Sequence, residues 1–491
     1  MATTPPEQAE RTAAAMDHAH LWHPFTPMRQ WRETEPMVIN SAEGFYLIDD
    51  QGNRYLDGVS SLWCNVHGHR VPAIDDAIRK QLDKVAHSTM LGLTHGPATE
   101  FAGKLVQCVN QAVPKTIDPQ ERLNKVFYSD AGATAVEVAF KMAVGYWHHT
   151  GRPEKNRFIG LAGAYHGDTA GTMSVGYSDL FHKPFLSMVF DVTSFPAIDA
   201  LRHEPTPGPQ STDAEVWPSE DKDIQQLLMK QSLDALHQVL ERQADQTAAI
   251  CIEPVMQGAA GMVCQPPGFV AEVAKLAREY DVLLILDEVA TGFCRTGSMF
   301  AFEFDLGTEG FVGPDILCLA KGITGGYLPL AATICSDKIE EAFTGELSER
   351  KTLYHGHTYT GNPLACAAAI ASLELFDDFY GGPGLLTHAS GSADLIASKL
   401  NGLRDSPNVL DIRQRGLMVG IELGKRDSQG NVEPFDFSKQ TGKVVCDALR
   451  IEGVLIRPLG NVVVLMPPPA MDWALIDELV SKTVAAIQRL S

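Results

Sequence analysis

Four short, continuous apolar runs most constrain what this chain can fold into. They are rich in β-branched and other bulky residues, have helix-like segments between them, and lie at 157–161, 248–252, 282–286 and 315–319. An uninterrupted apolar run of this length is typical of a strand that is buried on both faces, as in a parallel sheet covered by helices. The sequence therefore predicts an α/β fold.

The pattern changes after about residue 380. The sequence GGPG at 381–384 punctuates the chain, and strand-like runs at 417–422 and 462–466 follow among helix-like stretches. We expect a large domain over 60–378 and a small α/β domain formed by residues 1–59 and 379–491. The segment 203–223, rich in proline and acidic residues, is expected to be a surface excursion.

Composition and charge exclude several classes of partner. The chain has 491 residues, 45% of them hydrophobic, and a formal net charge of -21. This excess of negative charge repels phosphate backbones and anionic membranes, so we expect no nucleic acid and no membrane partner. Small molecules and another protein chain are the expected partners.

Cysteine usage and the N-terminus indicate the compartment. The nine cysteines form no CxxC pair and are odd in number, which argues against a disulfide framework and against a zinc or other metal site. The N-terminus lacks a basic region followed by an apolar run, and no stretch reaches the roughly 18 apolar residues that span a bilayer. We expect a cytoplasmic protein.

An acid and a lysine follow two of the apolar runs. Asp287 follows the run at 282–286, and Lys321 comes 34 positions later, after the run at 315–319. A buried carboxylate is costly unless a cation faces it, and a protonated pyridine nitrogen would serve. A lysine at the opposite end of such a ring would form an imine and later move the proton, as pyridoxal phosphate chemistry requires. Taken singly, Asp287 could instead cap a turn or pair with Arg295, and Lys321 could be a surface residue.

Small residues precede a predicted amphipathic helix within 129–147. Backbone N–H groups at a helix start lack partners within the helix and can bind a phosphate. Gly132 and Ala133 are the expected contact points, although a tight turn has the same sequence signature. Tyr165, which follows the run at 157–161, could present an aromatic face to a cofactor ring or be a structural tyrosine.

A second phosphate-binding candidate lies in the segment 353–369. Gly356, His357 and Thr358 precede another helix start rich in small residues. If this segment reaches a neighbouring subunit, the site is complete only in a dimer.

These residues resemble the class III aminotransferases, from His20 to about Pro468. The resemblance is carried by D-E-x-x-T-G-F-x-R-T-G at 287–297 and by the lysine of L-A-K-G-I-T-G-G at 319–326. It implies a fold-type-I transferase with pyridoxal 5′-phosphate as cofactor. It also implies a mostly parallel seven-stranded sheet between helices in the large domain, a smaller α/β domain from both termini, and a homodimer with shared active sites.

Within this family the chain is most similar to the branch that forms 7,8-diaminononanoate in biotin biosynthesis. The matching stretches are HLWHPFTPM at 20–28, DGVSSLWCNVHGH at 57–69, HGDT at 166–169, HGHTYTGNPLACAAA at 355–369 and IRPLGNVVVLMPP at 456–468. Members of that branch aminate the ketone of 8-amino-7-oxononanoate, usually with S-adenosylmethionine as amino donor. A branch that uses L-lysine as donor is also similar to this chain.

The resemblance implies roles for named residues. Lys321 bears the cofactor and Asp287 holds its pyridine nitrogen. Gly132, Ala133 and Thr358 hold the phosphate with His357 beside them, and Tyr165 stacks near the ring. Phe25, Leu62, Trp63, Tyr165, Gly356 and Arg457 bind substrate. Arg457 would bind the far carboxylate of the keto acid through two parallel hydrogen bonds, or form a surface ion pair; Arg295 could simply buttress the turn after Asp287.

Lys321 would also act as general base and acid once it is free of the cofactor. That role requires the pKa of its amine to fall well below the usual value of about 10.4. We expect burial and the nearby cationic ring to lower it.

Two positions depart from the common pattern of the biotin branch. Phe25 stands where a tyrosine is usual, and Leu62 stands where a tryptophan precedes Trp63. In the usual enzyme the hydroxyl of that tyrosine helps to recognise substrate, and phenylalanine lacks this hydroxyl. The donor is therefore open between S-adenosylmethionine and L-lysine.

Three other functions compete. One is a class III aminotransferase for ornithine, 4-aminobutyrate or a pyruvate-linked amine, against which HLWHPFT at 20–26 and Arg457 argue. Another is an aminomutase or decarboxylase on the same fold, since fold does not fix function; net amino transfer between two molecules would exclude it. The third is a non-catalytic binding module, which the presence of Lys321, Asp287 and the phosphate-loop residues disfavours.

Overall fold

The computed structural model describes residues 12–111, 113–115, 117–198, 222–308, 311, 313–377, 384–426 and 432–490. The expected surface excursion at 203–223 lies outside these residues except for its last two, which begin a helix. Every described helix is too short or too polar to cross a bilayer. Within the same ranges, no group of His, Cys, Asp and Glu side chains is arranged to hold a metal ion.

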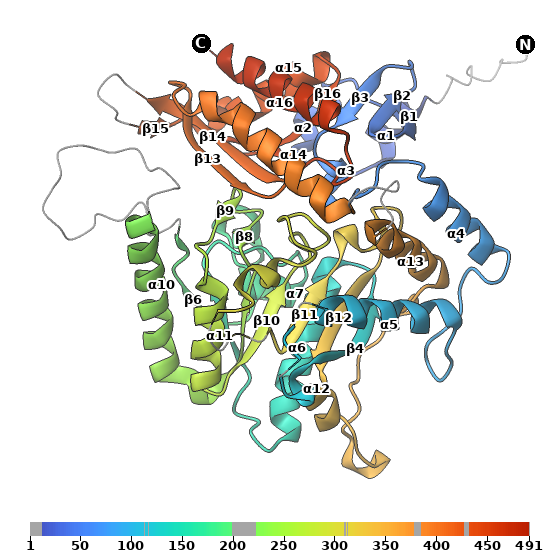
Figure 1. Cartoon of the computed structure of the whole chain (residues 1–491), viewed down its shortest axis with the longest axis vertical. Coiled ribbons are helices and arrows are strands. Elements are labelled where there is room, and N and C mark those ends of the chain that lie inside the picture. The colour runs from blue at the N-terminus through green and yellow to red at the C-terminus, as the bar shows by residue number, and fades with distance from the viewer. Residues whose placement is uncertain are drawn as a thin grey trace, which may run out of the picture.

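A seven-stranded sheet lies at the centre of the larger part of the molecule (Figure 1). Its strands, in spatial order, are β4 (Leu123–Ser129), β12 (Ala331–Ser336), β11 (Ile316–Leu319), β10 (Leu283–Asp287), β7 (Thr247–Ile252), β5 (Arg157–Leu161) and β6 (Thr193–Phe195). Neighbours pair in parallel except β12, which is antiparallel to both β11 and β4. The four apolar runs are β5, β7, β10 and β11, so the predicted α/β class and its mostly parallel sheet are confirmed.

The central strands are apolar throughout because helices cover both faces of the sheet. Side chains alternate along a strand, so neighbouring residues face opposite layers. In β7, Ala249 and Cys251 belong to a cluster with residues of α6 (Gly132–His149). Ile250 and Ile252 belong to the opposite cluster, which includes residues of the helices on the other face. Both faces of β7 are thus fully buried.

The helices around this sheet can be followed in Figure 1. α7 (Ala170–Val175) contacts α6 and β5, and α12 (Asp337–Ala342) contacts α6. Further helices around the sheet are α4 (Pro72–Leu82), α5 (Gly96–Asn110), α10 (Lys222–Gln243), α11 (Phe269–Glu279) and α13 (Pro363–Asp377).

The C-terminal part forms a second sheet. It consists of β13 (Val409–Arg415), β14 (Met418–Arg426), β18 (Val462–Leu465) and β17 (Arg457–Leu459), with β15 (Val432–Pro434) paired to β14. Its helices are α14 (Leu385–Leu400), α15 (Thr441–Ile451) and α16 (Trp473–Gln488). The two strand-like runs expected at 417–422 and 462–466 are β14 and β18.

The N-terminal strands join this C-terminal part. β1 (Ile39–Glu43), β2 (Tyr46–Asp49) and β3 (Arg54–Asp57) form a sheet whose last strand is β16 (Val454–Leu455). Figure 1 shows these blue strands beside the red C-terminal helices. The pairing supports a small domain built from both termini; its boundaries at 59/60 and 378/379 remain a proposal.

Candidate active site

A cavity of about 650 Å³ lies where four parallel strands end. Tyr165 follows β5, Glu253 follows β7, Asp287 ends β10 and Lys321 follows β11. The space beyond the carboxyl ends of the strands is where open α/β sheets bind ligands. The predicted residues that line the cavity are Trp63, Gly132, Ala133, Tyr165, Asp287 and Lys321.

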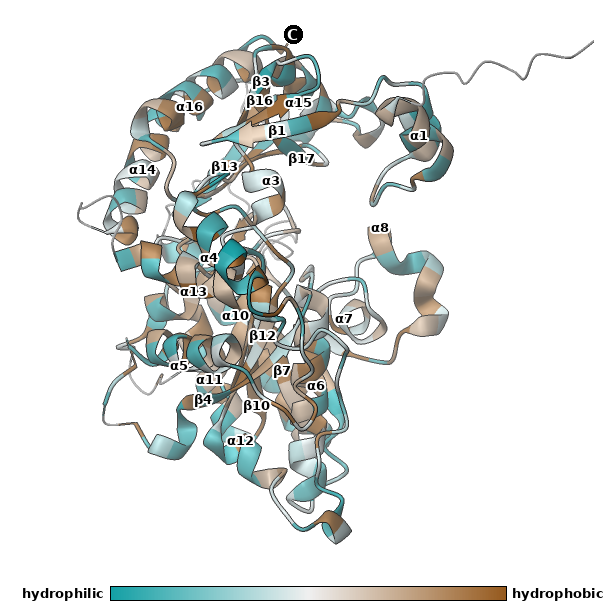
Figure 2. Ribbon diagram, turned by 90° about the vertical axis from the view of Figure 1, so that its right-hand side faces the viewer, coloured by the Kyte–Doolittle hydropathy of each residue, from teal (hydrophilic) through white to brown (hydrophobic). Residues whose placement is uncertain are grey.

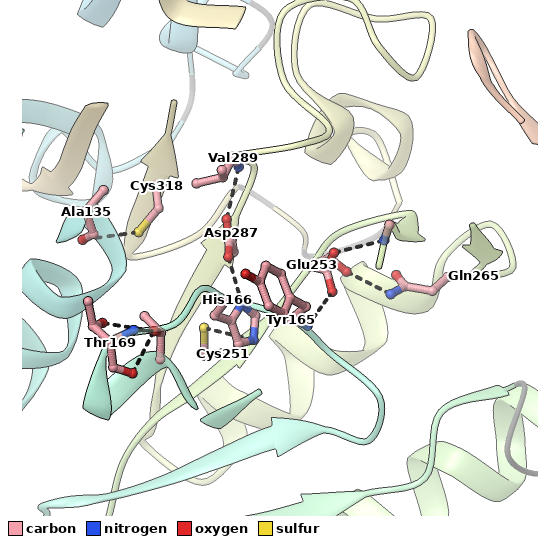
Figure 3. Close-up of polar contacts among 12 residues, drawn as sticks. Ala135, Tyr165, His166, Thr169, Cys251, Glu253, Gln265, Asp287, Val289 and Cys318 are labelled. Carbon is pink, nitrogen blue, oxygen red and sulfur yellow. Dashed lines mark hydrogen bonds and ion pairs between the residues drawn. The ribbon is translucent and has the colours of Figure 1, made fainter. Parts of the chain in front are cut away.

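Asp287 is held in place by two hydrogen bonds. Its Oδ1 accepts from the backbone N–H of Val289 at 3.0 Å, and its Oδ2 lies 2.7 Å from Nδ1 of His166 (Figure 3). On the other side of the imidazole, Nε2 lies 3.8 Å from Sγ of Cys251. Burial disfavours the charged imidazole, but its contacts with Cys251 and Asp287 outweigh burial and raise the pKa of His166 well above its usual value. His166 therefore backs the carboxylate that faces the cavity, and its raised pKa favours the cationic ring there.

Lys321 lies on a strained stretch of backbone directly after β11. Its φ is 42°, in the left-handed region that lysine seldom adopts. Its Nζ lies 5.0 Å from the centre of the Trp63 ring. Burial lowers the pKa of the amine, although Asp287 and Glu253 act in the opposite direction. The direction agrees with the expected one, and it favours the neutral amine that can attack a carbonyl or accept a proton.

The start of α6 supplies backbone donors to the cavity. The helix begins at Gly132, and the residue before it is Ala131, whose methyl group cannot accept a hydrogen bond from the first turn. The N–H groups of this turn can therefore serve a ligand phosphate. Gly167 packs against the same turn with a φ of +123°, and an added Cβ would lie 2.4 Å from Cβ of Ala133. The phosphate end of the cavity thus depends on a glycine at position 167.

Gly167→Ala is expected to weaken phosphate binding. The new methyl group would be strained at this φ and would displace Ala133, so the affinity for pyridoxal phosphate should fall about tenfold, equivalent to about 1.4 kcal/mol. Titration of the apoprotein, followed by absorbance, measures this change. Gly103→Ala in α5 is the matched control, because an added Cβ there meets nothing within 4 Å. Equal affinities for the two variants would contradict this role of Gly167.

Glu253 is a buried acid that sequence reasoning missed. Its Oε2 accepts from the N–H of Tyr165 at 3.1 Å, and its Oε1 accepts from the N–H of Gly258 at 2.9 Å. Burial raises the pKa of Glu253 to about 7, with His166 opposing and Asp287 reinforcing the rise. The available signal was the one that identified Asp287, an acid directly after a buried apolar run.

Arg295 holds the segment that carries Trp63. In α3 (Ser60–Trp63) both Ser60 and Trp63 have positive φ, 52° and 65°. The guanidinium of Arg295 is 1% exposed and donates to Oγ of Ser60 at 3.0 Å, to the carbonyl of Asn65 at 2.6 Å and to the carbonyl of Pro467 at 3.0 Å. Strained backbone persists only where its surroundings fix it. Arg295 therefore ties the loop after β10 to both the N-terminal and the C-terminal parts of the chain.

Arg295→Met should destabilise the fold by roughly 3 kcal/mol. The substitution fills similar space but leaves three buried oxygen atoms without their donor, at about 1–3 kcal/mol for each buried unpaired group before relaxation. Chemical denaturation of holoprotein measures the difference. Arg29→Met is the control, because Arg29 is 94% exposed and its ion pair with Glu33 contributes little. A change below about 1 kcal/mol for Arg295→Met would refute the structural role.

The other predicted residues lie outside the cavity wall formed by the described part of one chain. They are Phe25, Leu62, Gly356, His357, Thr358 and Arg457. α13 begins only at Pro363, so the segment with His357 and Thr358 precedes that helix and does not form its first turn. Arg457 starts β17 and is exposed. The roles of these six residues stay predictions.

Contacts between aromatic rings connect Phe25 to the cavity wall. α1 (Ala13–His20) and α8 (Asp179–His182) lie on the same side of the molecule (Figure 2). The ring of Phe25 meets that of Phe181 edge-on, with the ring centres 5.6 Å apart. The ring centres of Phe181 and Tyr165 lie 6.2 Å apart. Phe25 is 63% exposed. A change at Phe25 can therefore reach the cavity wall through Phe181 and Tyr165.

Known proteins are similar to this chain over nearly its whole length. The family model described as aminotransferase class-III matches residues 28–487. An adenosylmethionine-8-amino-7-oxononanoate aminotransferase from Geobacter sulfurreducens is 44% identical over 97% of this chain and 97% of its own. The protein of the same name from Aquifex aeolicus is 43% identical, covering 98% of each chain.

Solved structures agree with the sequence comparisons. The crystal structure of adenosylmethionine-8-amino-7-oxononanoate aminotransferase from Methanocaldococcus jannaschii matches with a TM-score of 0.83 at 39% identity, covering 96% of this chain and 98% of that one. An amine transaminase from an uncultivated Pseudomonas species, in its PLP-bound form, matches with a TM-score of 0.83 at 31% identity, covering 96% and 98%. The fold is therefore shared with both structures.

Proposed function

Since this chain belongs to the class III aminotransferases, which carry pyridoxal 5′-phosphate, we propose that it aminates the ketone of 8-amino-7-oxononanoate to give 7,8-diaminononanoate in biotin biosynthesis. One observation carries the chemistry: adjacent strands β10 and β11 bring the carboxylate of Asp287 and a lysine with a lowered pKa into one cavity. The substrate is supported by relatives at 43–44% identity whose names include that ketone.

The residues of the cavity fit the cofactor. Asp287 would hold the pyridine nitrogen, Lys321 would bind the aldehyde carbon, and the first turn of α6 at Gly132 and Ala133 would hold the phosphate. When bound, the cofactor supplies an electron sink that stabilises negative charge on the substrate carbon. Tyr165 lines the same cavity and would cover the ring.

Lys321 performs the proton transfers. Burial lowers the pKa of its amine, which favours the neutral form that takes a proton from the substrate carbon and returns it. The Trp63 ring beside Nζ keeps water from this side of the amine. His166 supports the process indirectly by fixing the carboxylate of Asp287.

Asp168 is suited to receive a substrate ammonium group. It lines the cavity, its side chain is 51% exposed, and its Oδ2 accepts a hydrogen bond from the hydroxyl of Tyr165 at 2.7 Å. A carboxylate binds an ammonium group through a charge-assisted hydrogen bond. We assign to it the amino group at carbon 8 of the ketone, and to Arg457 the carboxylate at the far end of the same molecule.

A homodimer with shared active sites is part of the proposal. His357 and Thr358 lie outside the cavity of one chain, next to the exposed rings of Tyr354 and Tyr359. Pairing with a second copy would cover these rings and bring the segment to the phosphate end of the partner's cavity.

The amino donor is S-adenosylmethionine or L-lysine. Both carry an α-amino group and an additional positive charge, so the acidic wall of this cavity suits either one. Phe25, which lacks the tyrosine hydroxyl, and Leu62, which is 53% exposed, are the positions expected to decide between them.

The proposal is tested by comparing acceptors and donors on the purified holoenzyme. We expect turnover with 8-amino-7-oxononanoate, and little with pyruvate or 2-oxoglutarate as acceptors. S-adenosylmethionine and L-lysine, supplied separately, identify the donor. Efficient use of pyruvate or 2-oxoglutarate with an ω-amino acid, and none of 8-amino-7-oxononanoate, would replace the biotin step with a general ω-amino acid aminotransferase.

A further inference from the structure

A buried histidine lies behind the cavity wall and takes no part in the mechanism above. His182 ends the short helix α8 and is 2% exposed. The ring centres of Tyr165, Tyr177 and Phe181 lie 6.4, 6.0 and 6.0 Å from that of His182. The Tyr165 and His182 rings are close to parallel, with an angle of 15° between them. An aromatic shell therefore fixes the orientation of this imidazole.

The hydrogen bonds of His182 determine where its proton lies. The backbone N–H of Ser178 donates to Nδ1 at 3.1 Å, so in the neutral ring Nδ1 is the acceptor and Nε2 carries the proton. Among the described residues, Nε2 has no partner within hydrogen-bond distance. It lies 3.7 Å from Oδ1 of Asp168. This buried N–H group therefore lies slightly beyond hydrogen-bond distance from a carboxylate that lines the cavity.

Two neighbouring aromatic side chains thus direct donors at the two oxygens of one carboxylate. The hydroxyl of Tyr165 already donates to Oδ2 of Asp168, and Nε2–H of His182 approaches Oδ1. A carboxylate held from both oxygens loses little freedom when an ammonium group binds it. Hydrogen bonds of this kind are often long before a substrate binds and shorten in the complex.

We propose that His182 is a positioning residue that fixes the carboxylate of Asp168 for the amino group of the ketone substrate. This inference rests on the proposed function, because it assumes an acceptor that carries an amino group next to its ketone. Its effect is on substrate recognition, since His182 itself does not line the cavity.

Two substitutions at the same position separate this role from a purely structural one. In His182→Asn the side-chain oxygen can replace Nδ1 as acceptor for Ser178, but nothing replaces the donor at Nε2. In His182→Gln the longer side chain can place an N–H group near the position of Nε2 but cannot also serve Ser178. The KM for 8-amino-7-oxononanoate should rise about tenfold in the Asn variant and change less than about twofold in the Gln variant, with kcat nearly unchanged in both.

Two controls tie the effect to Asp168 and to the substrate amine. In an Asp168→Asn background, His182→Asn should cause no further rise in KM. With 7-oxononanoate, which lacks the amino group, the Asn variant and the wild type should be equal. If the Asn variant has the wild-type KM and the Gln variant has a raised KM, His182 acts only as the acceptor for Ser178 that stabilises α8, and the inference is overturned. If the wild type does not turn over 8-amino-7-oxononanoate at all, the proposed function fails, and this inference falls with it.

A crystal structure of the wild-type holoenzyme with 8-amino-7-oxononanoate decides the matter even if neither variant folds. The expected result is Nε2 of His182 within about 3.2 Å of Asp168 Oδ1. A separation that stays at or beyond 3.7 Å, with the substrate amine bound elsewhere, would overturn the proposal.

Discussion

Lys321→Ala is expected to lower kcat for amino transfer by at least about 10⁴-fold. The substitution removes both the amine that binds the cofactor and the group that moves the proton, and no other lysine lines the cavity formed by the described residues. Product formation by the holoprotein, measured by mass spectrometry, gives the rate. Absorbance of the bound cofactor shows in the same sample whether the covalent link to the protein is lost.

Lys80→Ala is the control for this change. Lys80 is exposed on α4 and does not line the cavity, so its loss should leave kcat and the cofactor spectrum unchanged. A Lys321→Ala enzyme that keeps even a hundredth of wild-type activity would contradict the assigned role of Lys321.

Asp287→Asn should lower kcat/KM by about 10²- to 10³-fold while preserving the fold. The amide oxygen can still accept from the N–H of Val289, but the negative charge that would keep a pyridine nitrogen protonated is lost. The pKa of His166 should fall in the same variant, because Asp287 helps to raise it and burial acts against the charged ring. Steady-state kinetics measure the first effect, and ¹⁵N NMR of labelled histidine measures the second.

Asp83→Asn is the matched control, since Asp83 is exposed at the end of α4. It should change neither the kinetics nor the titration of His166. Should Asp287→Asn retain nearly full kcat/KM, the carboxylate would not be the partner of the pyridine nitrogen. Loss of activity with an unchanged His166 pKa would mean that the contact between the two side chains does not form in solution.

The parallel centre of the fold was predictable because its strands are apolar on both faces. β5, β7, β10 and β11 lie within one residue of the expected runs. β4 was not predicted because polar residues such as Asn124 and Lys125 interrupt it. β12 consists mainly of small residues, and its antiparallel direction depends on the loop after Lys321 rather than on its own sequence.

Site residues that follow a strand were predictable from the sequence. Site contacts between residues far apart in the sequence were less so. Lys321 and Asp287 both follow apolar runs, and the structure brings them into one cavity. His166 belongs to a recognised motif, yet its contact with Asp287 joins residues 121 positions apart and has no local signal. The role of Arg295 was open for the same reason, since its partners Ser60 and Pro467 come from opposite ends of the chain.

The nitrogen atom itself gives the most direct test of amino transfer to 8-amino-7-oxononanoate. The wild-type holoenzyme is supplied with this ketone and with either S-adenosylmethionine or L-lysine labelled with ¹⁵N, and the product is analysed by mass spectrometry. We predict a diamine with one ¹⁵N atom at carbon 7, formed from at least one of the two donors. Unlabelled product, or no diamine with either donor while the enzyme transfers amino groups to other ketones, would contradict the proposed reaction.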